Sequence, residues 1–196
     1  MTPQLCLGTV QMGLDYGITN LKGKINNKEV TKILNFAFRN GINYLDTAQS
    51  YGSSEYVIGK YSPNNSFFKI ISKMPSQSKY LRIKDIEKKW DDLFFKSLQN
   101  LNVKSIDSFL LHQFSDLLYP EGNRLMDWLK SLRERGLVSR IGVSIYSESD
   151  LDKLPLHELQ IIQLPLSIYD QRLMKSGTIK HLNKQGIAIH VRSVFL

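Results

Sequence analysis

The sequence predicts an α/β fold of the (β/α) TIM-type barrel class, incomplete, with about seven strands and ending after strand 7. Short apolar runs alternate with amphipathic helical patterns along all 196 residues, and this alternation is typical of βαβ units with a parallel sheet. No Gly-x-Gly-x-x-Gly follows the first run, which argues against a dinucleotide-binding domain of the Rossmann type. Seven strands in so short a chain favour a barrel over an open sheet, and we expect residues 1–196 to form a single domain.

The first half of the chain supplies three strands and three helices. The expected strands are 4–8, 42–46 and 67–73, and the expected helices begin at Asn26 and cover about 53–60 and 83–100. Asn26 can cap the first helix, and Glu29 three residues on completes a pattern similar to a capping box. Gly41 ends that helix, and Pro75 stops the third strand. A long loop is expected between the first strand and Asn26.

The second half continues the alternation. The expected strands are 108–111, 140–144, 160–164 and 187–190, and the expected helices are 122–135, a short helix after Ser147 and one within 179–184. Gly136 and Gly186 end two of these helices. Ser147 can cap the short helix, and Asp150 lies in its first turn, where a negative charge is favourable.

Composition and charge exclude several classes of protein. The net charge is +8, but the basic residues are scattered among acidic ones, so we expect no nucleic-acid partner. No apolar run approaches the length of about 18 residues that a membrane span needs, and no signal peptide is readable at the N-terminus. The single cysteine, Cys6, permits no internal disulfide, and we expect a cytoplasmic protein. No His and carboxylate spacing fits a metal site, so no metal is expected.

Four polar residues follow expected strands closely. Asp46, Lys73 and His112 come at or directly after the ends of apolar runs, and Tyr51 follows Asp46 by five residues. In a (β/α) barrel the carboxyl ends of the strands carry the chemistry. We therefore expect these four side chains to be the catalytic residues. Each alone has an ordinary structural explanation, such as a surface lysine or a buried histidine, but together they form a set suited to proton transfer.

The four residue types suit the transfer of a proton to or from a substrate oxygen. A phenol with a pKa of about 10 is a weak acid at neutral pH, and a nearby Lys73 ammonium would lower the pKa of Tyr51. Asp46 can pair with Lys73, and His112 can form a hydrogen bond at the substrate oxygen. No side chain can donate a hydride, so any reduction at this site would need a cofactor to supply one.

Several segments resemble the aldo-keto reductase family in order and spacing. They are Leu5-Cys6-Leu7-Gly8-Thr9, Gly41 to Ala48, Tyr51-Gly52, Ile71-Ser72-Lys73, Ser105 to His112, Arg140 to Ser144, Ile162-Gln163 and Val191-Arg192-Ser193. The resemblance implies an oxidoreductase that uses NADPH, or alternatively NADH, to reduce an aldehyde or ketone. It also implies the tetrad Asp46, Tyr51, Lys73 and His112, with Tyr51 as proton donor.

The resemblance further implies a cofactor site at Gly8, Thr9, Ser144, Gln163 and Arg192. Ser144 and Gln163 match positions that bind the nicotinamide carboxamide. The family often has Asn after that serine, where this chain has Ile145, and an aromatic residue where this chain has Arg192. The expected substrate is a small-molecule carbonyl compound, with a sugar as one candidate, because Asp15, Tyr16 and Tyr119 could face a polar ligand.

A full barrel of this class has about 250 residues, and no eighth strand follows residue 190. We therefore expect a C-terminally truncated member without the residues that hold the adenosine 2′-phosphate, and hence weak or absent activity. An open sheet edge would permit either a monomer or a dimer. Two alternatives stay open: a non-catalytic binding or assembly module of the same fold, and a barrel enzyme that moves protons without a hydride.

Overall fold

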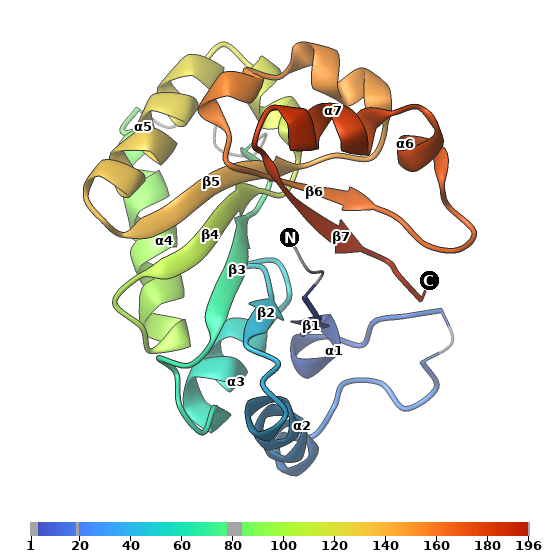
Figure 1. Ribbon diagram of the computed structural model, residues 1–196. Helices are drawn as coiled ribbons and strands as arrows, with labels where there is room; N and C mark the ends of the chain where they lie inside the picture. The colour runs from blue at the N-terminus through green and yellow to red at the C-terminus, as the bar shows by residue number, and fades with distance from the viewer. Residues whose placement is uncertain (1–3, 19, 78–83, 196) are drawn as a thin grey trace. The chain divides into compact units, whose positions relative to one another are not determined.

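The computed structural model describes residues 4–18, 20–77 and 84–195, and these form seven strands joined by helices (Figure 1). The strands are β1 (Cys6–Gly8), β2 (Tyr44–Asp46), β3 (Lys69–Met74), β4 (Ile106–Leu111), β5 (Val138–Ser144), β6 (Ile161–Pro165) and β7 (Ala188–Arg192). The α-helices are α1 (Val10–Gly13), α2 (Asn27–Arg39), α3 (Ser54–Tyr61), α4 (Ile86–Leu101), α5 (Gly122–Glu134), α6 (Arg172–Lys175) and α7 (Thr178–Lys184). The described residues also form the 3₁₀ helices η2 (Phe114–Leu118), η3 (Glu148–Lys153) and η4 (Leu156–Glu158).

The chain divides into two compact units. The first contains Met1–Pro75 and Lys84–Asp107, and the second contains Ser76–Ile83 and Ser108–Leu196. The expectation that 1–196 is a single domain stays a prediction. The succession of strand and helix is that of the predicted barrel class, with seven strands among the described residues.

In the first unit the three strands β1, β2 and β3 are parallel and adjacent in chain order. The register sets Gly8 opposite Asp46, and Asp46 opposite Ile71. Helices α3 and α4 pack together so closely that a Cβ on Gly59 would meet the carbonyl oxygen of Asn100. Fully buried apolar side chains fill the space between strands and helices, among them Leu34, Leu45, Ile58, Ile70 and Phe94.

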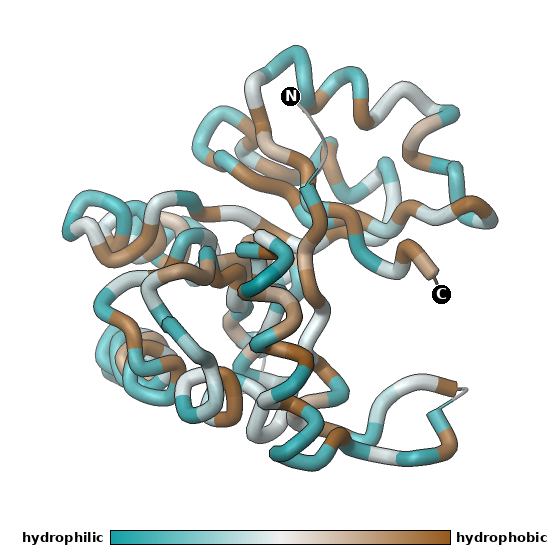
Figure 2. The backbone as a smooth tube through the Cα atoms, turned by 60° about the horizontal axis from the view of Figure 1, so that its bottom comes forward, coloured by the Kyte–Doolittle hydropathy of each residue, from teal (hydrophilic) through white to brown (hydrophobic). Residues whose placement is uncertain are grey.

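The first long helix begins as the sequence predicts. The Asn26 side chain accepts a hydrogen bond of 3.0 Å from the Glu29 backbone N–H, which satisfies one of the free amides at the helix start. Val30, Leu34 and Ala37 form the buried side of the helix. Figure 2 shows how hydrophobic and hydrophilic residues alternate along the backbone.

In the second unit β5, β6 and β7 are parallel and adjacent. The register places Ser144 opposite Gln163, and Gln163 opposite His190. Gly142 allows β5 and β6 to approach, because a Cβ there would meet the Ile161 carbonyl oxygen. Helix α5 buries Leu125, Met126, Trp128, Leu129 and Leu132.

Two parts of the predicted layout are wrong. The expected long loop after the first strand contains the helix α1, and α6 was not expected at all. Both have only four residues, too few for a helical hydrophobic period to show in the sequence. Most strand boundaries shift by one or two residues, as with β3, which ends at Met74 rather than Lys73. The expected start of the third helix at 83 lies outside the described residues.

Among the described residues, no helix combines the length and the apolar character needed to cross a membrane.

Candidate functional site

The structure pairs two of the predicted site residues directly. Asp46 is the last residue of β2 and Lys73 is the next-to-last residue of β3. Lys73 Nζ lies 2.7 Å from Asp46 Oδ1, and the two side chains are 0% and 14% exposed. Lys73 Nζ also donates a hydrogen bond of 2.7 Å to the Thr47 carbonyl oxygen. A buried ammonium needs such partners, and these hold it in one place.

Tyr51 lies against the same ammonium. Lys73 Nζ is 5.0 Å from the centroid of the Tyr51 ring, within the range of a cation–π contact. The Tyr51 backbone N–H donates to Ala48 O at 3.0 Å, and the Tyr51 carbonyl accepts from Ser54 N at 3.0 Å, so the residue belongs to a tight turn before α3. The first unit thus brings together three of the four predicted catalytic residues.

The close fit of Gly13 explains part of this geometry. A Cβ on Gly13, the last residue of α1, would collide with the Tyr51 carbonyl oxygen and with Ser54 N. The unexpected helix α1 therefore supports the Tyr51 turn directly.

His112 directly follows β4 and belongs to the second unit. It is half-buried. It therefore ends a strand as the sequence indicates, and its role beside the substrate oxygen stays a prediction.

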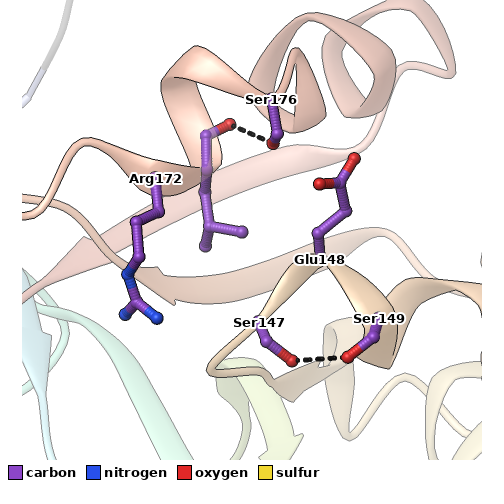
Figure 3. Close-up of a pocket in the computed structure, with 6 residues that line it drawn as sticks. Ser147, Glu148, Ser149, Arg172 and Ser176 are labelled. Carbon is purple, nitrogen blue, oxygen red and sulfur yellow. Dashed lines mark hydrogen bonds between the residues drawn. The ribbon is translucent and has the colours of Figure 1, made fainter.

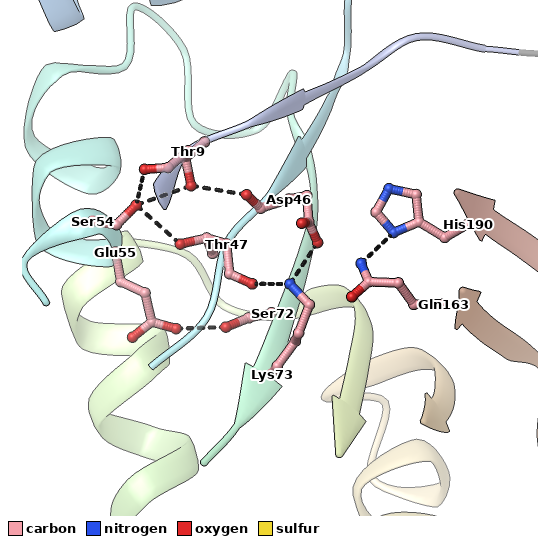
Figure 4. A network of polar contacts seen from close by, with 9 residues as sticks. All are labelled: Thr9, Asp46, Thr47, Ser54, Glu55, Ser72, Lys73, Gln163 and His190. Carbon is pink, nitrogen blue, oxygen red and sulfur yellow. Dashed lines mark hydrogen bonds and ion pairs between the residues drawn. The ribbon is translucent and has the colours of Figure 1, made fainter. Parts of the chain in front are cut away.

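Gly8 and Thr9 end the first strand in different environments. Gly8 is exposed, and a Cβ there would meet nothing within 4 Å. Thr9 is 1% exposed, and its hydroxyl donates to Asp46 O at 2.9 Å. Ser54 Oγ donates to Thr9 O at 2.9 Å and accepts from Thr47 Oγ1 at 3.1 Å, as Figure 4 shows. The Thr9 side chain therefore fixes the end of β2, and its expected contact with a cofactor stays a prediction.

The second unit holds the two expected carboxamide residues side by side. Ser144 and Gln163 are each 1% exposed and are register partners. Ser144 Oγ is buried and has no hydrogen-bond partner among the described residues. Gln163 Nε2 lies 2.8 Å from His190 Nδ1 (Figure 4). Sequence reasoning missed His190, for which only its position near the end of the last strand was available.

Arg192 already has partners of its own. Its guanidinium lies 4.1 Å from the centroid of the Tyr146 ring, and Nη2 donates a hydrogen bond of 3.4 Å to Ile145 O. A planar guanidinium can stack on a ring, and one face of Arg192 does so here. Its expected stacking on a nicotinamide stays a prediction.

Two titratable groups lie close to the Asp46–Lys73 pair. Burial raises the pKa of the Cys6 thiol, and the Asp46 charge adds to the effect while Lys73 opposes it. Burial also raises the pKa of the Glu55 carboxyl, against hydrogen bonds from Ser72 and other side chains and the Lys73 charge. Sequence reasoning gave neither group a role.

One surface cavity of about 260 Å³ lies elsewhere in the second unit. Figure 3 shows it between the start of η3 and the helix α6. Its lining residues are Ser147, Glu148, Ser149, Arg172, Leu173 and Ser176. None of the predicted site residues lines it.

Metal-ligating clusters are absent from the part of the chain that the structure describes: no group of three or more His, Cys, Asp or Glu side chains there could hold an ion.

Comparison with known proteins decides the family. The model of the aldo/keto reductase family matches residues 4–196. The chain belongs to this family. Its fold is that of an incomplete (β/α) barrel, and family membership supports an oxidoreductase function.

Similar proteins are consistent with this assignment. The chain is 25% identical to D-arabinose 1-dehydrogenase of Saccharomyces cerevisiae over 119 residues. This match covers 58% of the chain and 36% of the relative. The chain thus spans about a third of the length of this curated relative.

Solved structures of aldo-keto reductases share the fold, and two of them serve as examples. An aldo-keto reductase from Bacillus halodurans in its holo form has a TM-score of 0.75 at 19% identity, over 96% of this chain and 61% of that one. An aldo-keto reductase from Klebsiella pneumoniae in complex with NADPH has a TM-score of 0.73 at 16% identity, over 97% and 63% of the two chains.

Proposed function

We propose that this aldo-keto reductase interconverts a carbonyl group and an alcohol with a nicotinamide cofactor, with Tyr51 as the proton donor in the reductive direction. The observation that carries the proposal is the packing of the Tyr51 ring against a fully buried Lys73 that is itself paired with Asp46. Burying a lysine carries a desolvation penalty, so its place beside a phenol favours a chemical role for the two side chains.

The side chains would divide the work as follows. Reduction adds a hydride to the carbonyl carbon and a proton to the carbonyl oxygen. The Tyr51 phenol would give the proton, and the Lys73 cation would stabilise the phenolate that remains. Asp46 would keep Lys73 charged and oriented, and His112 would form a hydrogen bond with the substrate oxygen. A bound nicotinamide would supply the hydride.

We propose that residues of the second unit hold the nicotinamide carboxamide. A carboxamide offers both a donor and an acceptor, and the buried Ser144 hydroxyl lacks a partner among the described residues. A buried hydroxyl without a hydrogen bond is costly, so a ligand that satisfies it is favoured. Gln163, next to it in the register, would provide the second contact. We propose Gly8, Thr9 and Arg192 as further cofactor contacts.

We propose NADPH as the cofactor, because an aldo-keto reductase of the same fold is described in complex with it. We propose a sugar-like aldehyde or lactol as the substrate, because the yeast relative is a D-arabinose 1-dehydrogenase. The exposed Tyr16 and the neighbouring Asp15 lie in the loop between α1 and α2 and would contribute to substrate specificity.

The proposal is tested by following nicotinamide absorbance in both directions. The chain is mixed with NADPH or NADH and a panel of pentose, hexose and simple aromatic aldehydes, and with the oxidised cofactors and aldoses for the reverse reaction. In keeping with the weak activity that the sequence predicts, we expect slow turnover with NADPH and a preference for polyhydroxylated substrates. Binding of NADPH without turnover of any substrate would favour the non-catalytic module instead.

A further inference from the structure

The first unit contains a buried carboxyl group to which the proposed reaction assigns no task. Glu55 lies in α3, four residues after Tyr51, and is 4% exposed. Its Oε1 accepts a hydrogen bond of 2.6 Å from Ser72 Oγ, and its Oε2 accepts one of 3.1 Å from Ser97 Oγ. One side chain of α3 thus contacts both β3 and α4.

Both serines that bind Glu55 are connected to the backbone of Lys73. Ser72 is the residue before Lys73 in β3. Ser97 Oγ also accepts a hydrogen bond of 2.7 Å from Gln49 Nε2, and the Gln49 backbone N–H donates to Lys73 O at 3.1 Å. Glu55 is therefore connected to the Lys73 segment by two hydrogen-bond routes, one through Ser72 and a longer one through Ser97 and Gln49 (Figure 4 shows the Ser72 contact).

Charge connects the same groups. The Lys73 ammonium acts electrostatically on Glu55 and opposes the rise of the Glu55 pKa that burial causes. Hydroxyl donors such as Ser72 and Ser97 satisfy a buried carboxylate. Lys73 is paired with Asp46 at 2.7 Å, and its charge also acts on the Glu55 carboxyl without a direct ion pair. Any charge that Glu55 carries weakens the pull of Lys73 on the Tyr51 phenol.

We propose that Glu55 is a positioning residue of the proposed reaction, which fixes the Lys73 segment of β3 beside the Tyr51 turn and whose negative charge moderates the effect of Lys73 on the phenol. This inference rests on the proposed function. Glu55 would then be a second carboxylate, besides Asp46, that influences Lys73, and it would do so without contacting the substrate.

The test is a direct titration of the Tyr51 phenol by NMR in the full chain labelled with ¹³Cζ-tyrosine, with the signal assigned through Tyr51→Phe. Glu55→Gln keeps the shape and removes the charge, so we expect the Tyr51 midpoint to fall by about half a pH unit or more. In the kinetic assay we expect Glu55→Gln to change kcat and its pH profile while KM changes little. The matched control is Glu29→Gln, because Glu29 is an exposed carboxylate of α2, and it should leave the midpoint unchanged.

A Tyr51 midpoint that is the same in wild type and Glu55→Gln would overturn the inference, because removal of the Glu55 charge would then have no effect on the phenol. If Glu55→Gln does not fold, the double variant Ser72→Ala/Ser97→Ala removes the two hydroxyl donors and keeps the carboxylate. We then expect a shifted midpoint, and an unchanged one contradicts the inference. The NMR readout needs no turnover, so a chain without reductase activity defeats the proposed function while the charge coupling of Glu55 is still decided.

Discussion

Lys73 and Asp46 form an ion pair of 2.7 Å in which the lysine side chain has no exposed surface. The pair joins the ends of two neighbouring strands, and the Tyr51 ring packs on the lysine. The same contact therefore bears on the stability of the first unit and on its proposed chemistry.

Replacing Asp46 by Asn should destabilise the protein strongly. The substitution leaves a buried ammonium without its counter-charge, and breaking such a pair costs about 3 kcal/mol or more. Urea unfolding at neutral pH measures the loss. The control is Lys32→Met, which removes an exposed pair with Glu29 and should change the free energy of unfolding by less than about 0.5 kcal/mol. Equal effects of the two variants would contradict the importance of the buried pair.

Replacing Ser144 by Ala should separate stability from cofactor binding. The Ser144 hydroxyl is buried without a partner among the described residues, so its removal should leave the free energy of unfolding unchanged or raise it. Affinity for NADPH should fall by about 3- to 10-fold, the value of one hydrogen bond. Fluorescence titration with NADPH measures this, with the exposed Ser149→Ala as control. An unchanged affinity would remove Ser144 from the proposed carboxamide site.

Replacing either of two glycines of the first unit by Ala should have different effects on stability and activity. At Gly13 a Cβ would collide with the Tyr51 carbonyl oxygen, whereas at Gly8 it would meet nothing within 4 Å. We expect Gly13→Ala to lower both the melting temperature and the turnover, because the Tyr51 turn must move. Gly8→Ala should melt like the wild type and lose affinity only for the cofactor. A Gly13→Ala protein with normal turnover would show that α1 does not support the Tyr51 turn.

Asp116 should make stability depend on pH in the second unit. Burial raises the pKa of its carboxyl above the usual 3.8, against hydrogen bonds from Gln77 N and Ser76 Oγ. Because the folded state then binds the proton more tightly than the unfolded state, this group favours folding at low pH and the benefit is lost as pH rises from about 4. Asp116→Asn lacks this dependence.

The measurement is the free energy of unfolding of wild type and Asp116→Asn across the acid range. We expect the free energy of unfolding of the wild type to fall relative to that of Asp116→Asn as pH rises above 3.8. A difference that stays constant over that range would show that the pKa of Asp116 is unshifted.

Strong local signals in the sequence predicted much of the fold. The cap at Asn26 and the strand that ends at Asp46 are both present, since a cap and an apolar run act within a few residues. The helices α1 and α6 were missed because four residues show no period. Such short helices depend on tertiary contacts, and in α1 the contact is that of Gly13 with the Tyr51 turn.

The candidate site was partly readable for a similar reason. Asp46 and Lys73 follow apolar runs, and parallel strands bring such ends together, which their 2.7 Å contact bears out. Glu55 was missed because a glutamate in a helix is usually exposed. The available signal was its position three residues before Ile58 on the buried side of α3. The convergence of Ser72 and Ser97 on Glu55 depends on distant segments, which sequence spacing does not reveal.

The central claim, that Tyr51 donates the proton, is tested most directly by the turnover of Tyr51→Phe with NADPH and the best aldehyde substrate. The variant keeps the ring that packs on Lys73 and removes only the hydroxyl. We predict a loss of kcat of at least about 10²-fold, the lower range for a positioned acid. Tyr56→Phe, which alters an exposed tyrosine of α3, should keep full turnover. A Tyr51→Phe protein with turnover near that of the wild type would contradict the account.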